Sequence, residues 1–253
     1  MKLEYVSTST VETWRDCQMK WYLGHDGSPR PELKGDALLY GSAIHDFAEK
    51  QALKLGAMKN ESASRPKDAV TKTWQSDAPY PPGFAARWAA DQNTVTRWLR
   101  SLFVDPSYDY EVERRLEHKL SDDLTFVGYI DFLRTGEGEA FILDYKTTKQ
   151  SKWRKPAKSS LQLKAYAAVI SKQFDIRAER VTCALGFLQG ELLDSVVFTQ
   201  RQLDSAMADI VECADVIRNT DKASVTPSQL CQYCDFRERC AHWIATVKEN
   251  EEW

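Results

Sequence analysis

The sequence contains no apolar run of about 18 residues, the length that a membrane-spanning helix requires. Its start, MKLEYVSTST, also lacks the apolar core of a secretory signal. We therefore expect a cytoplasmic protein with no membrane partner. A reducing compartment disfavours disulfides, so the six cysteines are expected to serve other purposes.

No internal repeat and no GxxxxGK[ST] phosphate-binding motif is present, which excludes a repeat architecture and a built-in ATP-driven motor. A net charge of −3 argues against a chain that coats nucleic acid indiscriminately, although a local basic channel is compatible with it. The length of 253 residues, with 43% hydrophobic and 28% charged residues, is typical of a globular protein with an ample core.

Hydrophobic periodicity predicts several elements. A long helix is expected over residues 84–103, and strands are expected over 108–119, 180–188 and 192–198. Near the start, Ser9-Thr10-Val11-Glu12 has the pattern of a capping box and predicts that Ser9 caps a helix. The helix is expected to carry Val11, Trp14 and Trp21 on one face.

The centre of the sequence predicts a hairpin in which each apolar segment is associated with an acidic residue. Two apolar segments, residues 126–133 and 140–143, flank a turn with two glycines at 135–138. Each segment is associated with an acid: Asp131 lies within the first, and Asp144 directly follows the second. A carboxylate at an apolar strand must be paired, hydrogen-bonded or bound to a cation.

Two carboxylates that are brought together repel each other unless a metal ion neutralises them, and hard divalent cations prefer such oxygens. Lys146 lies two residues after Asp144, so on a strand both side chains point to the same face. Asp131, Asp144 and Lys146 therefore indicate a metal site beside a fixed positive charge. That combination suits phosphodiester hydrolysis.

A further motif follows on a predicted helix. In order, the sequence carries Gly128-Tyr129-Ile130-Asp131, Asp144-Tyr145-Lys146 and Gln162-x-x-x-Tyr166. These motifs resemble the PD-(D/E)XK nuclease superfamily, and more narrowly its RecB-type branch. That branch includes the nuclease modules of RecB and AddB helicase–nucleases and the CRISPR-associated RecB-like exonucleases.

The resemblance implies an α/β fold, in which helices flank a central mixed sheet and a helical lobe is added. It implies one RecB-like nuclease domain over residues 1–253. Within it, residues 36–107 would form the helical lobe and 108–219 the nuclease core. Residues 1–35 and 220–253 would form an iron–sulfur-stapled terminal region.

His45 and Glu49 are spaced as i and i+4 on a predicted helix, which by itself favours a salt-bridged surface face. However, Gly41-x-x-x-His45 resembles the first motif of the family, which implies that His45 is a metal ligand. The family often has a glutamate on the strand before the hairpin. Glu113 matches best, Glu111 and Glu117 are alternatives, and a charged edge strand is the other interpretation.

The implied activity is that of a metal-dependent DNA exonuclease acting on single-stranded ends, with 5′→3′ polarity favoured. Mg²⁺ or Mn²⁺ would be bound by His45, Asp131, Asp144 and the Tyr145 carbonyl. Lys146 would orient or activate the attacking water, and Glu113 would complete the catalytic set. The alternatives are a non-catalytic DNA-end-binding or adaptor module and a structure-specific endonuclease. Helicases, recombinases and CRISPR adaptation proteins are the implied partners.

Residues 145–174 contain no acid but eight Lys or Arg residues, which predicts a positive patch beside the site. A solvated basic loop is the alternative. The residues expected to contact DNA are Lys149, Lys152, Trp153, Arg154 and Lys155, with Gln162 and Tyr166 by resemblance. Trp153 could stack on an unpaired base. Without the resemblance, Tyr166 would be interpreted as a core aromatic.

Three of the six cysteines, Cys231, Cys234 and Cys240, form a C-x2-C-x5-C pattern near the end of the sequence. A tetrahedral metal centre needs a fourth ligand, and Cys17 is the natural one, although a helical cysteine is often only a buried small side chain. C-x2-C alone suggests zinc. The whole pattern resembles the structural [4Fe–4S] staple of AddB-type and CRISPR-associated RecB-like nucleases.

Overall fold

The computed structural model describes residues 3–28, 36–54, 85–102, 105, 107–149 and 156–251. The helices and strands are, in chain order, β1 (Tyr5–Val6), α1 (Thr8–Asp16), α2 (Gln18–Leu23), α3 (Asp36–Lys54), α5 (Ala85–Leu102), β2 (Asp109–Ser121), β3 (Leu124–Gly136), β4 (Glu139–Lys149), α6 (Leu161–Gln173), β5 (Val181–Gln189), β6 (Leu192–Val197), α7 (Gln200–Arg218) and α8 (Ala241–Glu251). Across these residues, no helix is both long and apolar enough to cross a membrane.

The six strands form one mixed sheet in the order β1-β3-β4-β5-β6, and β2 pairs with β3. The β1–β3 and β4–β5 pairs are parallel, and the others are antiparallel. Because β2 follows β3 along nearly its whole length, β1 and β4 must share the other edge of β3. β4 occupies the end at residues 132–136 and β1 the end at 125–126, so Asp131 lies just where β4 has left β3.

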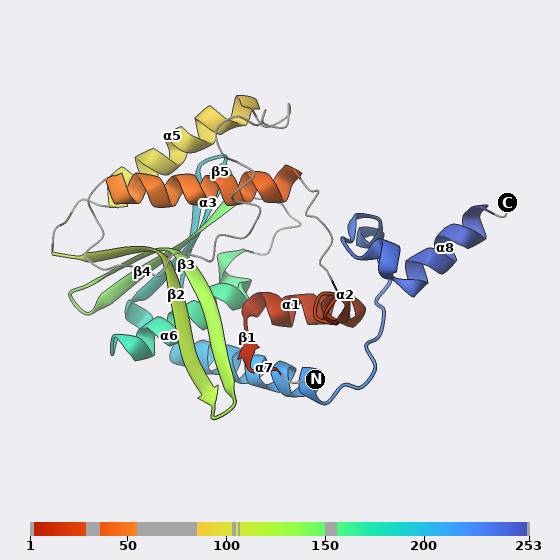
Figure 1. Cartoon of the computed structure of the whole chain (residues 1–253). Helices are drawn as coiled ribbons and strands as arrows, with labels where there is room; N and C mark the ends of the chain where they lie inside the picture. The colour runs from red at the N-terminus through yellow and green to blue at the C-terminus, as the bar shows by residue number, and fades with distance from the viewer. Residues whose placement is uncertain are drawn as a thin grey trace.

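Helices cover both faces of the sheet (Figure 1). One core packs α1, α6 and α7 against one face around side chains such as Phe126 and Ile142. A second core packs α3 and α5 against the opposite face around Phe132 and Leu143. The residues of β4 alternate between these two cores, as the two-residue period of a strand requires. In β3 the alternation shifts at Asp131, because Ile130 lies in the first core and Phe132 in the second. The predicted α/β architecture with a mixed sheet flanked by helices is confirmed.

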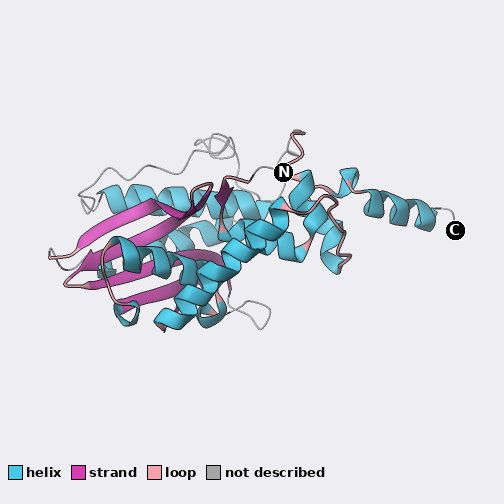
Figure 2. Ribbon diagram, turned by 90° about the horizontal axis from the view of Figure 1, so that it is seen from below, coloured by secondary structure: helices cyan, strands magenta, loops and turns pink. Residues whose placement is uncertain are grey.

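The segment after α7 returns to the N-terminal helices. The Met19 N–H donates to the Ser224 carbonyl at 2.9 Å, and the Ser224 N–H donates to the Gln18 side chain at 3.0 Å. Further along, Arg239 forms an ion pair with Asp26. α8 then projects away from the body of the protein, as the view from below shows (Figures 1 and 2).

The prediction that Ser9 caps the first helix is wrong. Ser7 is the N-cap: its hydroxyl accepts from the Thr10 N–H at 3.1 Å, and the Thr10 hydroxyl accepts from the Ser7 N–H at 3.3 Å. The cap comes two residues earlier because the pairing of β1 with β3 ends at Val6. The chain is therefore able to turn into the helix at Ser7.

The expected continuous helix from Val11 to Trp21 is also interrupted. Cys17 is extended, with φ −164°, and separates α1 from α2. The returning segment accounts for the break, because the Ser224 carbonyl satisfies a first-turn amide of α2 that a continuous helix would have bonded internally. Trp14 and Trp21 still pack edge to face, with ring centroids 5.3 Å apart.

We predict that Gly128→Ala lowers the free energy of unfolding by about 1–3 kcal/mol, the usual cost of overpacking a core. A Cβ at Gly128 would lie 2.5 Å from Cε1 of Tyr166, which is only 4% exposed and has little room to move. Urea denaturation with unchanged m-values measures the effect.

Gly41→Ala on α3 is the matched control. Its added Cβ would meet nothing nearer than the Thr147 hydroxyl at 3.8 Å, and alanine favours a helix over glycine by up to ~1 kcal/mol. Equal urea midpoints for Gly128→Ala and the wild type would show that Tyr166 does not pack as described.

Candidate active site

Asp131 lies at the point where β3 and β4 separate. Their antiparallel ladder runs from Gly136↔Glu139 to Phe132↔Leu143 and then ends. Beyond it, Oδ2 of Asp131 accepts a hydrogen bond from the Tyr145 N–H at 2.7 Å. The carboxylate thus takes the place of a strand carbonyl, which explains how an acid that is 3% exposed is accommodated in an apolar strand.

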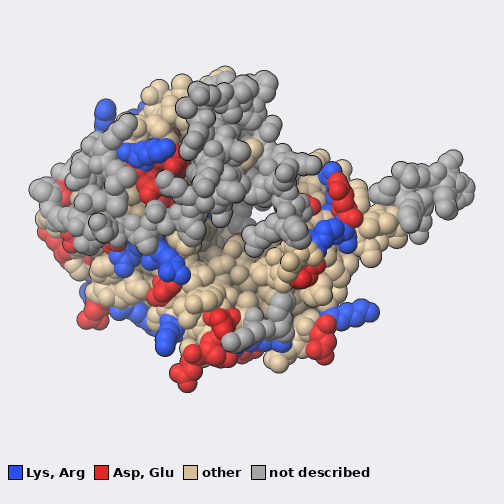
Figure 3. Space-filling model, viewed as in Figure 1, with Lys and Arg blue, Asp and Glu red and all other residues tan. Residues whose placement is uncertain are grey.

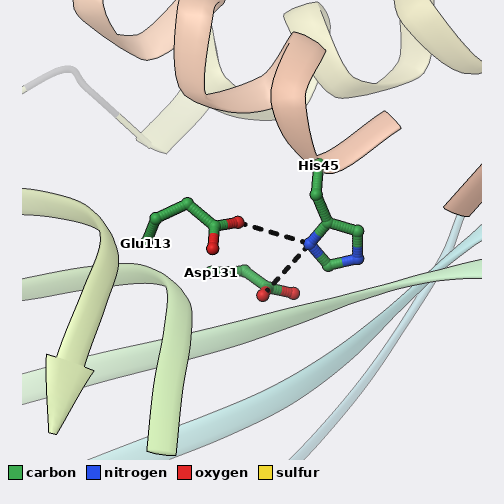
Figure 4. A group of neighbouring side chains, drawn as sticks. All are labelled: His45, Glu113 and Asp131. Carbon is green, nitrogen blue, oxygen red and sulfur yellow. Dashed lines mark hydrogen bonds and ion pairs between the residues drawn. The ribbon is translucent and has the colours of Figure 1, made fainter. Parts of the chain in front are cut away.

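His45 of α3 faces the other oxygen of this carboxylate. Its Nδ1 lies 3.2 Å from Oδ1 of Asp131 and 3.4 Å from Oε1 of Glu113 (Figure 4). One ligand atom from each of the three residues lies within 4.8 Å of the others. A helix and two strands therefore bring an imidazole and two carboxylates to one point, as a metal ion would require.

Glu113 reaches this point through an irregular backbone. The flanking pairs Val112↔Phe132 and Arg114↔Ile130 place it opposite Asp131 in the register of β2 and β3. Its φ of 48° is in the left-handed region, which costs a non-glycine residue on the order of 1–3 kcal/mol and is typical of functional sites. The other candidates point elsewhere, because Glu111 pairs with Arg114 and Glu117 with Arg115.

Asp144 and Lys146 form an ion pair on β4 beside this group. Burial raises the pKa of Asp144 and the charge of Asp131 adds to this effect, whereas Lys146 opposes it. Asp144 is 4% exposed but is not one of the three residues that gather around His45. Asp144 and the Tyr145 carbonyl therefore remain predictions as metal ligands.

Gln162 and Tyr166 of α6 lie next to Lys146. The ammonium of Lys146 donates to Oε1 of Gln162 at 3.5 Å, and Nε2 of Gln162 donates to the Tyr166 hydroxyl at 3.0 Å. That hydroxyl also accepts from the Tyr129 N–H at 3.2 Å. The Gln-x-x-x-Tyr pair thus joins α6 to β3 and supports the lysine, and a contact of either residue with DNA remains a prediction.

The predicted DNA contacts Lys152, Trp153, Arg154 and Lys155 lie outside the described residues, and so does the side chain of Lys149. Sequence reasoning also missed a set of residues beside Thr147, which directly follows Lys146. Arg87 of α5 donates to the Thr147 carbonyl and to Asp91, and Asp91 accepts a hydrogen bond from the Tyr40 hydroxyl. The i, i+4 spacing of Arg87 and Asp91 was a signal, but it is equally common on solvated helix faces.

Cys17 ends α1, and Cys231, Cys234 and Cys240 lie in the returning segment. All four thiols are free and partly buried. Burial raises the pKa of the Cys234 thiol. In the described part of the chain, however, only His45, Glu113 and Asp131 gather as tightly as the ligands of one ion. Cys183 and Cys213 are buried.

The electrostatics of the three-residue group fit a divalent cation. Burial alone would lower the pKa of His45, but the charges and hydrogen bonds of Asp131 and Glu113 outweigh it and raise the pKa to about 10. The site therefore attracts one positive charge even without a metal. An imidazole nitrogen beside carboxylate oxygens is a donor set that Mn²⁺ or Mg²⁺ accepts.

The sequence profile of the PD-(D/E)XK nuclease superfamily matches residues 5–241. The chain belongs to this superfamily. Its members hydrolyse phosphodiester bonds of DNA with Mg²⁺ or Mn²⁺, and the group formed by His45, Glu113 and Asp131 suits such an ion.

Other comparisons add little. One solved structure, "Crystal structure of SSO0001", is similar with a TM-score of 0.43 and 12% sequence identity, and the similarity covers 94% of this chain and 86% of that chain. No curated protein matches the sequence.

We predict that metal binding releases close to one proton near neutral pH. With its raised pKa, His45 stays protonated up to about pH 10 in the metal-free protein, and a metal ligand must be deprotonated. The association constant for Mn²⁺ should therefore rise roughly tenfold per pH unit below that pKa. Calorimetric titrations in buffers of different ionisation enthalpy count the protons.

In the same titrations, His45→Gln should release no such proton. His118→Gln on β2 is the control, because burial lowers the pKa of His118 and it lies outside the three-residue group. A proton count that His45→Gln leaves unchanged would contradict the assignment.

Proposed function

We propose that this protein is a metal-dependent DNA exonuclease of the RecB-type branch. The observation that carries the proposal is the convergence of His45, Glu113 and Asp131 beside the Asp144–Lys146 ion pair, in a chain of the PD-(D/E)XK superfamily. The exonuclease mode, the preference for single-stranded ends and the 5′→3′ polarity rest on the resemblance of the motifs.

In this mechanism, His45, Glu113 and Asp131 would hold the ion, with Asp144 and the Tyr145 carbonyl as its further protein ligands. When bound, the ion would supply a water of lowered pKa and would polarise the phosphate. Lys146 is held between Asp144 and Gln162, so its ammonium is positioned to orient that water and to offset charge that develops on the phosphate. The burial of both aspartates strengthens these interactions by excluding bulk water.

The DNA path is proposed to follow residues 149–155 and the exposed side of Gln162. Lys149, Lys152, Arg154 and Lys155 would contact phosphates, and Trp153 would stack on a base. In the view of Figure 3, the basic side chains of the described residues are interspersed with acidic ones. The proposed path therefore depends on the basic stretch in the sequence, and binding should weaken as salt rises.

The biological setting follows from the same resemblance. We place the activity in recombination, repair or CRISPR adaptation in the cytoplasm, with a helicase, recombinase or CRISPR adaptation protein as partner.

We predict that Lys146→Ala slows cleavage about 100- to 1,000-fold, the usual effect of losing one preorganised electrostatic contact, and that DNA binding is retained. End-labelled single- and double-stranded DNA is incubated with Mn²⁺, Mg²⁺ or EDTA, and the products are separated on a sequencing gel. Lys119→Ala, an exposed lysine on β2, is the matched control and should cleave like the wild type.

Laddering from one end that requires metal would support the exonuclease and reveal its polarity. Internal cuts at defined structures would favour an endonuclease. A gel shift with intact DNA in every lane would instead identify a non-catalytic DNA-end-binding or adaptor module. Full activity of Lys146→Ala would refute the assigned role of the lysine.

We also propose a structural [4Fe–4S] cluster bound by Cys17, Cys231, Cys234 and Cys240, with zinc as the alternative. The support is the approach of the two chain segments. The returning segment bonds to α2, and Arg239 forms an ion pair with Asp26. Four thiolates are the ligands that such a cluster requires. Its role would be to join residues that are more than two hundred positions apart in the sequence.

We predict that anaerobically purified protein is brown and contains about four iron atoms per chain, and that Cys17→Ser lowers both the iron content and the melting temperature. Cys213→Ala on α7 is the control, because this buried thiol is outside the proposed set. Iron and zinc are measured by elemental analysis. A colourless protein with one zinc would select the alternative, and unchanged iron in Cys17→Ser would exclude this residue as a ligand.

A further inference from the structure

The β4–β5 ladder changes register directly after Lys146. The two strands pair regularly from Ala140↔Val181 to Lys146↔Phe187, and the next pair is Lys149↔Gln189. β4 therefore uses three residues where β5 uses two, which is the signature of a β-bulge. Bulges bend a strand and re-aim its side chains, and they are common beside active sites.

Two side chains bind the backbone within this bulge. The Thr147 carbonyl accepts a hydrogen bond from Nη2 of Arg87 at 2.5 Å and another from Nε2 of Gln189 at 3.1 Å. Gln189 belongs to the neighbouring strand, whereas Arg87 comes from α5 in the helical lobe. The lobe therefore contacts the backbone of Thr147, the residue that immediately follows Lys146.

Arg87 is itself held in place. Its Nη2 lies 3.4 Å from Oδ2 of Asp91, and the same oxygen accepts a hydrogen bond from the Tyr40 hydroxyl at 2.6 Å. The guanidinium carbon lies 5.0 Å from the centre of the Tyr40 ring, a cation–π distance. Asp91 is 4% exposed, whereas the Arg87 side chain is 32% exposed, so the carboxylate is the buried partner of this ion pair. Tyr40 lies on α3, the helix that carries His45.

The side chain of Lys146 is long and 30% exposed, pairs with Asp144 and lies 3.5 Å from Gln162. The position of its ammonium is therefore sensitive to the backbone from which it extends. In enzymes, a misplacement of 1 Å is able to cost about 100-fold in rate.

We propose that Arg87 is a positioning residue for the nuclease reaction: by binding the Thr147 carbonyl, it fixes the bulge that aims Lys146 at Asp144. This inference rests on the proposed function, because it assumes that Lys146 acts in cleavage. It assigns the helical lobe a role beyond covering the sheet, since α3 delivers His45 and α5 fixes the backbone beside Lys146.

The test compares Arg87→Ala and Arg87→Lys with the wild type in the full-length, anaerobically purified protein. We expect Arg87→Ala to lower kcat for DNA cleavage by about 30- to 100-fold, with the KM and the Mn²⁺ affinity within about twofold of the wild type. Arg87→Lys keeps a donor and should recover part of the rate. Millimolar guanidinium should partly rescue Arg87→Ala but not Lys146→Ala.

Arg97→Met is the matched control. Arg97 also lies on α5, but it is 58% exposed, and it pairs at 2.5 Å with Glu191 in the turn between β5 and β6. Its cleavage rate should equal that of the wild type. If the KM of Arg87→Ala rises, or its Mn²⁺ affinity falls, by as large a factor as kcat falls, the fold is loosened generally and the positioning role is overturned.

Crystal structures of the wild type and Arg87→Lys or Arg87→Ala provide a readout that does not depend on activity. The Thr147 carbonyl should shift in Arg87→Ala, and Lys146 should leave Asp144. If the wild type cleaves DNA and Arg87→Ala cleaves equally well, the inference fails and the proposed function stands. If the wild type does not cleave, the proposed function fails, and an unmoved Lys146 would refute the inference separately. If Arg87→Ala does not fold, Arg87→Lys carries both comparisons.

Discussion

The rest of this structure depends on two carboxylates that are buried where the β3–β4 ladder ends. Asp131 and Asp144 are 3% and 4% exposed and repel each other, so each needs a nearby positive group. His45 approaches one of them from α3, and Lys146 approaches the other along β4. The proposed metal ion would relieve the same repulsion. The two buried carboxylates that suit a metal ion therefore also destabilise the fold. The two apolar cores on either side of the sheet must offset this loss of folding free energy.

The backbone departs from regular geometry at two points around these acids. On β2, Glu113 adopts a left-handed φ opposite Asp131, and on β4 the ladder bulges after Lys146. A regular strand alternates its side chains between two faces, so it is unable to direct several consecutive polar groups to one point. The irregularities remove this restriction. Each one is supported by a neighbouring element, which keeps an unfavourable conformation in a single state.

The sequence was sufficient for the parts that depend on local pattern. The two apolar segments around the glycine-containing turn at 135–138 predicted the hairpin, and the helix expected over 84–103 was found at Ala85–Leu102. The sequence was insufficient where contacts with distant segments determine the local backbone. The cap at Ser7 depends on where β1 leaves the sheet, and the break at Cys17 depends on Ser224. Likewise, the sequence does not distinguish the three glutamates of β2, because the left-handed φ of Glu113 directs only that side chain to the site. Arg87 has the sequence pattern of a solvated helix charge, and only the structure shows that it binds the Thr147 carbonyl.

The closure of the chain's first elements by its last has a consequence for biosynthesis. Arg218 donates to the Leu3 carbonyl, and the Ser224 carbonyl completes the first turn of α2. A ribosome adds residues at about 5–20 per second, so the N-terminal strand and helices wait on the order of 10–40 s for these partners. During that interval, Trp14 and Trp21 lack the surroundings that bury them in the finished protein. We therefore expect the nascent chain to expose apolar surface to chaperones until the segment around Ser224 has been synthesised.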